Sequence, residues 1–165
     1  MSQVQIIEIT NEDSHFLAQV EPLFSLMYEQ MALQTPAKKL KLSLVSDGSK
    51  LWLEGIKRML GRMGLIIVAV ENEKVIAFIY GHIHFTPDYF GSLKVGTIAH
   101  VFVLPEKQGL GLGRELLETM EQWLISKNVH SIGLQVISGN MPAIAFWKKG
   151  GYEKELLQFR KMINV

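Results

Sequence analysis

The segment EKQGLGLGREL, residues 106–116, places a glycine at every second position directly before a helical pattern. Glycine loses more conformational entropy on folding than any other residue, and the start of a helix does not require three of them. Free N–H groups at a helix N-terminus attract anions, and a missing Cβ lets a phosphate approach those groups. The segment therefore indicates a loop that binds a phosphate-bearing ligand.

Two common phosphate-binding motifs do not fit this loop. The dinucleotide motif requires G-x-G-x-x-G, whereas Gly109, Gly111 and Gly113 form G-x-G-x-G. The nucleotide P-loop ends in Gly-Lys-Ser or Gly-Lys-Thr, and here the last glycine precedes Arg114 and Glu115. A glycine-rich turn without any ligand is the structural alternative.

Hydrophobic periodicity predicts one α/β domain over residues 1–165. The expected elements, in chain order, are a strand at 4–10, helices at 16–31 and 51–60 joined by a polar, basic connection at 35–49, a hairpin on either side of residues 71–74, a strand at 96–105, a helix at 111–127, a strand at 130–138, a short helix at 140–151 and a last strand at 156–163. A strand–helix–strand unit implies a parallel crossover, whereas sequential strands pair antiparallel. The expected fold is a mixed, mostly antiparallel sheet flanked by helices.

Composition excludes several classes of function. The 17 Lys and Arg residues balance 16 Asp and Glu residues, so neither a nucleic acid nor a membrane surface is an expected partner. The chain has no cysteine, which excludes disulfides, thiolate nucleophiles and cysteine-based zinc sites. No leader-like pattern opens the sequence and no apolar run approaches the length of a membrane span. We therefore expect a cytoplasmic protein.

Two segments resemble signatures of the GNAT superfamily of N-acetyltransferases. Residues 101–117, VFVLPEKQGLGLGRELL, resemble its acyl-CoA signature, (Gln or Arg)-x-x-Gly-x-(Gly or Ala). Residues 140–152, NMPAIAFWKKGGY, resemble its second signature, Asn-x-x-Ala-x-x-Phe-Tyr followed by Gly-Phe. The matching residues are Gln108, Gly111, Gly113, Asn140, Ala143, Phe146, Trp147, Gly151 and Tyr152. The resemblance covers about residues 95–152 and implies a parallel strand pair that splays around acyl-CoA.

The resemblance also assigns contacts to acetyl-CoA, the implied acyl donor. The backbone of Val101, Phe102 and Val103 is expected along the acyl arm. The loop that holds the pyrophosphate comprises Gln108, Gly109, Leu110, Gly111, Leu112, Gly113 and Arg114. Asn140, Ala143 and Trp147 are expected on the other side of the pantetheine. For Arg114, a solvated surface cation is the alternative.

The implied reaction is transfer of an acetyl group to a primary amine of a small molecule or of a peptide or protein N-terminus. Family members often protonate the leaving thiolate with a tyrosine, but Trp147 occupies that position, and an indole N–H donates a hydrogen bond without giving up its proton. A catalytically weak acyl-CoA-binding or ligand-sensing protein is therefore an alternative. A homodimer is compatible with the resemblance.

His100 is the candidate general base, because the family's usual upstream carboxylate is replaced by Thr97 and Ala99. Strand alternation places His82 and His84 on one face with Tyr80, and neighbouring strands bring His100 towards that set. A structural role is the alternative for each histidine, and we expect no metal site. Trp52 lies off the apolar stripe of its helix, so it either covers the edge of a pocket or lies on the surface.

Overall fold

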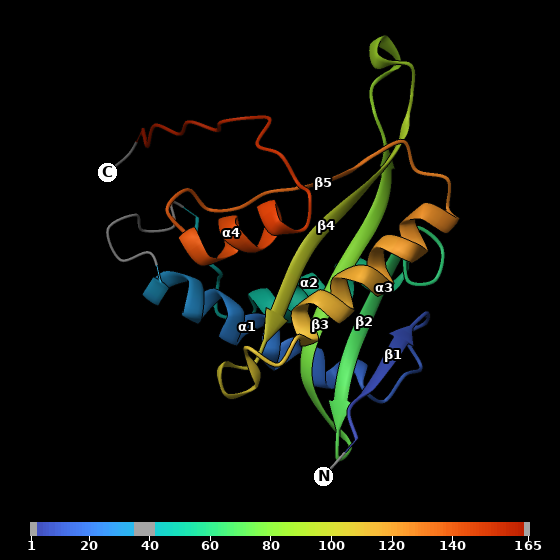
Figure 1. Cartoon of the computed structure of the whole chain (residues 1–165), viewed down its shortest axis with the longest axis vertical. Helices are drawn as coiled ribbons and strands as arrows, with labels where there is room; N and C mark the ends of the chain where they lie inside the picture. The colour runs from blue at the N-terminus through green and yellow to red at the C-terminus, as the bar shows by residue number, and fades with distance from the viewer. Residues whose placement is uncertain (1–2, 35–41, 164–165) are drawn as a thin grey trace.

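A five-stranded sheet with the order β1-β2-β3-β4-β5 forms the centre of the part of the chain that the structure describes, residues 3–34 and 42–163 of a computed structural model (Figure 1). The strands are β1 (Gln5–Ile9), β2 (Gly64–Glu71), β3 (Lys74–Phe85), β4 (Lys94–Val103) and β5 (Ile132–Leu134). The first four strands pair antiparallel in chain order, and β5 pairs parallel to β4. The expected mixed, mostly antiparallel sheet is confirmed.

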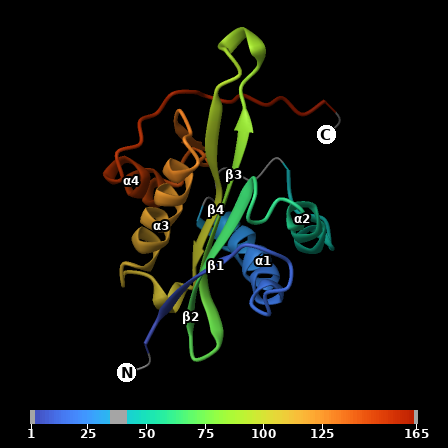
Figure 2. The same ribbon diagram turned by 90° about the vertical axis from the view of Figure 1, so that its right-hand side faces the viewer.

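Helices cover both faces of this sheet. They are α1 (Leu17–Gln34), α2 (Gly48–Lys57), α3 (Leu112–Ser126) and α4 (Met141–Lys149), with short 3-10 turns η1 (Asp88–Phe90) and η2 (Pro105–Lys107). Figure 2 shows α1 and α2 on one side of the sheet and α3 and α4 on the other. No helix in the described part of the chain has the length and apolar character that a membrane span requires.

The continuous apolar run of β2 explains this three-layer arrangement. Ile66, Val68 and Val70 belong to the core beneath α1 and α2. Leu65 and Ile67 belong to the core beneath α3 and α4. A strand whose two faces are both apolar is stable only with a covering layer on each side. The sequence of β2 therefore requires helices on both faces.

A β-bulge in β4 changes which face its side chains occupy. Tyr80 of β3 pairs with His100, but the next residue of β3 pairs with Ile98, so Ala99 is the extra residue. Ile98 packs in the core beneath α3, whereas Ala99 packs in the core beneath α1 and α2. Strict alternation would return His100 to the face of Ile98. The bulge instead turns His100 towards α1 and α2.

The parallel pairing of β4 with β5 is short. It joins residues 96–98 of β4 to residues 132–134 of β5. The strand expected over residues 130–138 is therefore limited to three residues, and residues 99–103 of β4 keep only β3 as a sheet neighbour within the described structure. Figure 1 shows the chain leaving β5 and α4 lying beside the second half of β4.

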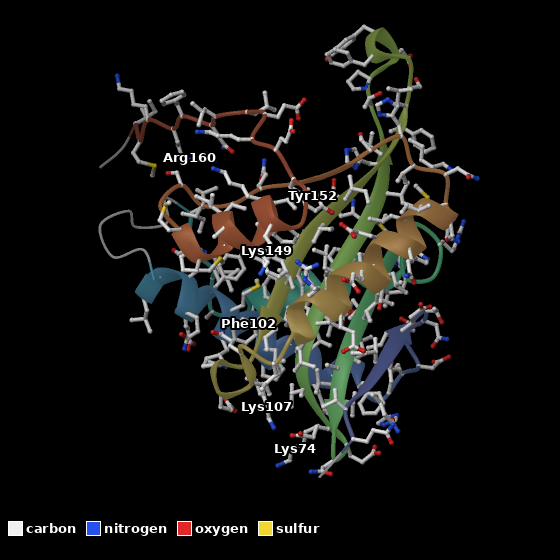
Figure 3. All side chains as sticks on the ribbon, viewed as in Figure 1. Lys74, Phe102, Lys107, Lys149, Tyr152 and Arg160 are labelled. Atoms are coloured by element: carbon white, nitrogen blue, oxygen red, sulfur yellow. The ribbon has the colours of Figure 1, made fainter. Side chains whose placement is uncertain are left out.

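The prediction of a last strand at residues 156–163 is wrong, because the structure contains no strand there. Residues 152–161 form no helix or strand, and the side chains of Leu156 and Phe159 are 84% and 90% exposed. The adjacent Leu156 and Leu157 put apolar groups on both sides of the segment, so its pattern selects no buried face. Tyr152 donates a hydrogen bond to Glu121 on α3, and the tail then passes above α4 (Figure 3).

The expected connection at 35–49 lies partly outside the described residues.

Gly96 and Gly133 provide a test of packing in the paired segment of β4 and β5. A Cβ on Gly96 would lie 2.9 Å from Leu124 Cδ2, whereas a Cβ on Gly133 would meet nothing within 4 Å. We expect Gly96→Ala to lower the free energy of unfolding by about 1–3 kcal/mol, because it overpacks the core. Urea denaturation measures this loss. Gly133→Ala is the control, and an equal effect of the two changes would contradict the packing argument.

Candidate active site

The glycine loop links the end of β4 to the start of α3. Gly109 and Gly111 have φ angles of +79° and +84°, in the left-handed region that favours glycine, and Gly111 is the N-cap of α3. Gln108 Nε2 donates to the carbonyl oxygen of Val103 at 3.1 Å. Lys107 forms an ion pair with Glu71 at the end of β2. These contacts hold the base of the loop against the sheet.

The loop presents free backbone donors. Within the described structure, no backbone or side-chain hydrogen bond is donated by an N–H group of residues 109–114. Gly109 and Gly111 have open space where a Cβ would stand. Free N–H groups at the positive end of a helix of this length form an anion-binding site when the ligand can reach them. The geometry of the loop therefore fits the phosphate site expected from the sequence.

The two signature segments meet beside this loop. A Cβ on Gly113 would lie 3.7 Å from the Phe146 ring of α4 and 3.8 Å from Val103 of β4. A small cavity of about 80 Å³ lies between α3 and α4, and its lining includes Arg114, Leu117 and Phe146. The structure thus brings the end of β4, the start of α3 and α4 together, although Gly113 and Phe146 lie 33 positions apart in the sequence.

Other residues expected around acyl-CoA differ in their surroundings. Arg114 lies 3.7 Å from Glu118 in a half-exposed pair, which contributes little to stability. Asn140 is buried and caps α4, because its Oδ1 accepts a hydrogen bond from the Ala143 N–H at 3.3 Å. Leu110 is exposed, whereas the side chain of Leu112 belongs to the core.

Trp147 is buried on the α3 side of the sheet. Its ring packs edge to face against Phe146 and Tyr152, with centroids 5.0 and 5.3 Å away. Tyr152 does not replace the missing tyrosine acid, because its hydroxyl donates to Glu121 Oε1 at 2.7 Å. Burial, and then this hydrogen bond, raise the pKa of Tyr152 above its usual value.

His100 lies in an aromatic cluster on the opposite face of the sheet. We define this cluster as Phe24 and Tyr28 of α1, Trp52 of α2, Tyr80 of β3, and His100. The ring centroid of His100 lies 4.9 Å from Phe24, 5.5 Å from Trp52, 6.3 Å from Tyr80 and 6.4 Å from Tyr28. Tyr80, His82 and His84 follow one another on that face, as alternation predicts.

Burial, and then the nearby His82, lower the pKa of His100 to about 4. The pKa of His82 is also lowered, first by burial and then by His84. His100 is therefore neutral at physiological pH. Its Nδ1 is buried and has no hydrogen-bond partner within the described residues. A neutral imidazole with a free ring nitrogen is able to accept a hydrogen bond or a proton.

Sequence reasoning missed part of this cluster. Phe24 belongs to a helical stripe that predicts core packing, and Tyr28 does not stand out in the sequence. Trp52 stacks on Phe24 with a centroid separation of 4.0 Å and an interplanar angle of 9°. Its place off the apolar stripe of α2 was the available signal. The structure favours the edge of a site over a free surface position, since Trp52 Nε1 is buried.

Comparisons with known proteins identify the class. The profile of the Acetyltransferase (GNAT) family matches residues 34–152, which is more than half of the chain. The chain therefore belongs to the GNAT acetyltransferase family.

Individual relatives resemble only part of the sequence or only its fold. Mycothiol acetyltransferase of Amycolatopsis mediterranei (strain U-32) is 36% identical over 88 residues, 53% of this chain and 29% of the relative. Mycothiol acetyltransferase of Arthrobacter sp. (strain FB24) is 26% identical over 91 residues, which are 55% of this chain and 28% of the relative. The chain thus spans less than a third of the length of these curated relatives.

Solved structures match the whole architecture. Aminoglycoside N-acetyltransferase AAC(6')-Iy in complex with CoA has a TM-score of 0.75 and 17% identity, over 99% of this chain and 97% of the other. Ribosomal-protein-alanine N-acetyltransferase from Brucella melitensis biovar Abortus 2308 has a TM-score of 0.68 and 14% identity, over 98% and 100%. At these identities the similarity concerns the fold.

The depressed pKa of His100 predicts a pH dependence of stability. The unfolded chain protonates this histidine below about pH 6.5, whereas the folded chain does so only below about pH 4. Between these values the unfolded state binds more protons, so stability falls as the pH falls, by at most about 1.4 kcal/mol per pH unit from this group. Urea denaturation at several pH values measures the slope. His100→Gln should flatten it, whereas His130→Gln, at an exposed position, should not. Equal slopes for the parent and His100→Gln would contradict the assignment.

Proposed function

We propose that this chain is an N-acetyltransferase that moves the acetyl group of acetyl-CoA to a primary amine. The observation that carries the proposal is the row of free N–H groups at residues 109–114, directly after the part of β4 that has no β5 neighbour. The free N–H groups suit a pyrophosphate, and the part of β4 without a β5 neighbour suits an extended acyl arm. We regard residues 1–165 as one such domain and propose a cytoplasmic location.

The proposed donor contacts follow the geometry of the site. The free N–H groups of residues 109–114 would hold the pyrophosphate, with Arg114 adding positive charge. The N–H of Gln108, expected in this set, instead donates to the Pro105 carbonyl oxygen at 3.3 Å. The backbone of residues 101–103 would run beside the acyl arm, with Asn140, Ala143 and Trp147 on its other side. Val101 and Val103 pack towards α3, and Phe102 packs towards α1 and α2. β4 therefore links the donor side to the face that carries His100.

The reaction joins the amine nitrogen to the acetyl carbon and breaks the bond between that carbon and sulfur. One amine proton leaves, and the electron pair of the broken bond goes to sulfur. His100 would accept a hydrogen bond from the amine and pass its proton to solvent, because the ring is neutral above about pH 4. A thiol with a pKa of about 8.5 is a fair leaving group as the thiolate, so water is able to supply its proton.

The relatives support this choice. The matched curated proteins are mycothiol acetyltransferases, and a structural neighbour is an aminoglycoside acetyltransferase with bound CoA. A protein that binds acyl-CoA without useful turnover is the second candidate, because Trp147 stands where the family usually has a tyrosine acid. Release of free CoA from acetyl-CoA with a panel of amines separates these two functions. CoA release that depends on an amine supports the transferase, and binding without release supports the second candidate.

Gly111 and Gly91 form a matched pair for testing the donor site. Their φ angles are +84° and +86°, and neither has an atom within 4 Å of an added Cβ. Alanine therefore adds the same backbone strain at both positions, but only Gly111 lies in the loop. We expect Gly111→Ala to weaken acetyl-CoA binding tenfold or more, and Gly91→Ala to leave it unchanged.

Titration calorimetry measures both affinities, and thermal melts should show similar losses of stability for the two variants. An unchanged affinity in Gly111→Ala would remove the loop from the donor site.

His100→Gln tests the proposed proton acceptor. We expect this change to lower kcat by roughly 10²-fold with acetyl-CoA affinity little changed, since general base catalysis typically contributes this much. Because the pKa of His100 is about 4, protonation of this residue should lower the parent's rate only as the pH falls towards that value, with no inflection near 6.5 from this residue. Steady-state rates between pH 4 and 9 measure both effects. A variant with the parent's rate would return His100 to a structural role.

A further inference from the structure

The aromatic cluster contains two polar atoms that lack a partner. Within the described residues, the buried side-chain atoms without a hydrogen bond are Trp52 Nε1 and His100 Nδ1. Their rings meet edge to face with centroids 5.5 Å apart. A buried polar group left unpaired costs about 1–3 kcal/mol, so native proteins rarely keep two of them side by side. The pair marks a place where a ligand supplies the missing partners.

The two atoms require different partners. An indole N–H only donates, so Trp52 needs an acceptor such as a carbonyl oxygen. We assign Nδ1 as the unprotonated ring nitrogen of neutral His100, so it accepts and needs an N–H donor. An α-amino carbonyl group carries both functions on adjacent carbon atoms.

The charge around the cluster argues against a polycationic ligand. A carboxylate close to His100 would raise its pKa, but burial and His82 are its only causes of change, and both lower it. Burial alone raises the pKa of Tyr28, and burial alone raises that of Tyr80 to about 12. Among the described residues, no carboxylate therefore acts on these three groups. An ammonium group placed against these rings would gain no paired carboxylate in exchange for its hydration.

The remaining surface of the cluster is aromatic. Tyr28, Trp52 and His100 are only partly buried, so the cluster reaches the surface of the protein. Trp52 Nε1 and His100 Nδ1 themselves are buried, so the proposed ligand requires the side chain of Tyr28 or Trp52 to move aside. Planar apolar groups pack favourably against such rings in stacked or edge-to-face arrangements.

We propose that the acetyl acceptor is an α-amino carbonyl compound with an aromatic side chain. Its amine donates to His100 Nδ1, its carbonyl oxygen accepts from Trp52 Nε1, and its ring packs against the partly exposed Tyr28 and Trp52 side chains. This inference rests on the proposed function. Transfer forms the bond from nitrogen to the acetyl carbon and breaks the carbon–sulfur bond. The amine proton passes through His100 to solvent, and the sulfur takes its proton from solvent.

Substrate comparison tests the proposal in the full chain. Phenylalaninamide carries amine, carbonyl and ring, phenethylamine lacks the carbonyl, and glycinamide lacks the ring. We expect kcat/KM for phenylalaninamide to exceed that of each of the other two by about tenfold or more, as loss of one hydrogen bond or of ring burial implies. A polycationic aminoglycoside should react more slowly still. A faster reaction with the aminoglycoside or with glycinamide would overturn the proposal. A peptide that starts with phenylalanine distinguishes a chain terminus from a free amino amide as the source of this group.

Trp52→Phe isolates the indole N–H. The variant keeps a ring to stack on Phe24 but has no donor, so we expect the preference for phenylalaninamide over phenethylamine to fall to about threefold or less. Trp123→Phe, the same change on α3, should keep the parent's preference. Equal preferences in the two variants would contradict a role for Trp52 Nε1.

A binding measurement separates this proposal from the proposed function. The chain has three tryptophans, so a ¹H–¹⁵N spectrum contains three indole signals, and Trp52→Phe identifies that of Trp52. Phenylalaninamide should shift the Trp52 signal downfield by forming the new hydrogen bond, whereas phenethylamine should not. A shift without acetyl transfer would refute the transferase function and keep the acceptor site. No shift on saturation with phenylalaninamide would overturn the site, whatever the transfer assay shows.

Discussion

The end of pairing between β4 and β5 is the constraint on which the candidate site depends. β5 pairs with residues 96–98 only, so the following five residues of β4 have one sheet neighbour within the described structure. Backbone polar groups need partners, and a strand edge without a neighbour is a template for an extended ligand. The same chain then enters a helix whose first N–H groups are also free. Two sets of backbone donors therefore lie in sequence beside α4.

The bulge at Ala99 determines which face of the sheet His100 occupies. Without it, His100 would share the face of Ile98 and pack beneath α3. With it, His100 enters an environment of four other rings, where desolvation keeps the imidazole neutral. In the proposed reaction, a base with so low a pKa is suited to orienting an amine and relaying its proton, and less suited to holding that proton. The amine of the proposed reaction must then arrive unprotonated, which links the rate to its own pKa.

Much of the layer structure was predictable, because β2 and the helices carry strong periodic patterns. The glycine loop was predictable as well, since only a ligand or a special turn explains three alternating glycines. The length of β5 was not, because the apolar pattern of residues 130–138 continues beyond the point where the chain separates from β4. The tail was not predictable for a related reason: a β-prone sequence forms a strand only when a sheet edge is within reach. In the described structure residues 156–163 pair with no strand of the sheet, and Leu157 remains exposed.

By itself, the sequence determined the family, the order of the elements up to α4 and the position of the glycine loop proposed to bind an anion, because local spacing encodes all three. Gly109, Gly111 and Gly113 need no distant residue to define a loop that a phosphate is able to approach. The tertiary structure alone decided which side chains surround His100. Phe24, Trp52 and Tyr80 come from three different elements, and their contact depends on helix packing and on one extra residue in β4. The pKa of His100 depends on that contact, because desolvation is a property of all the neighbours together and of no single residue in the chain.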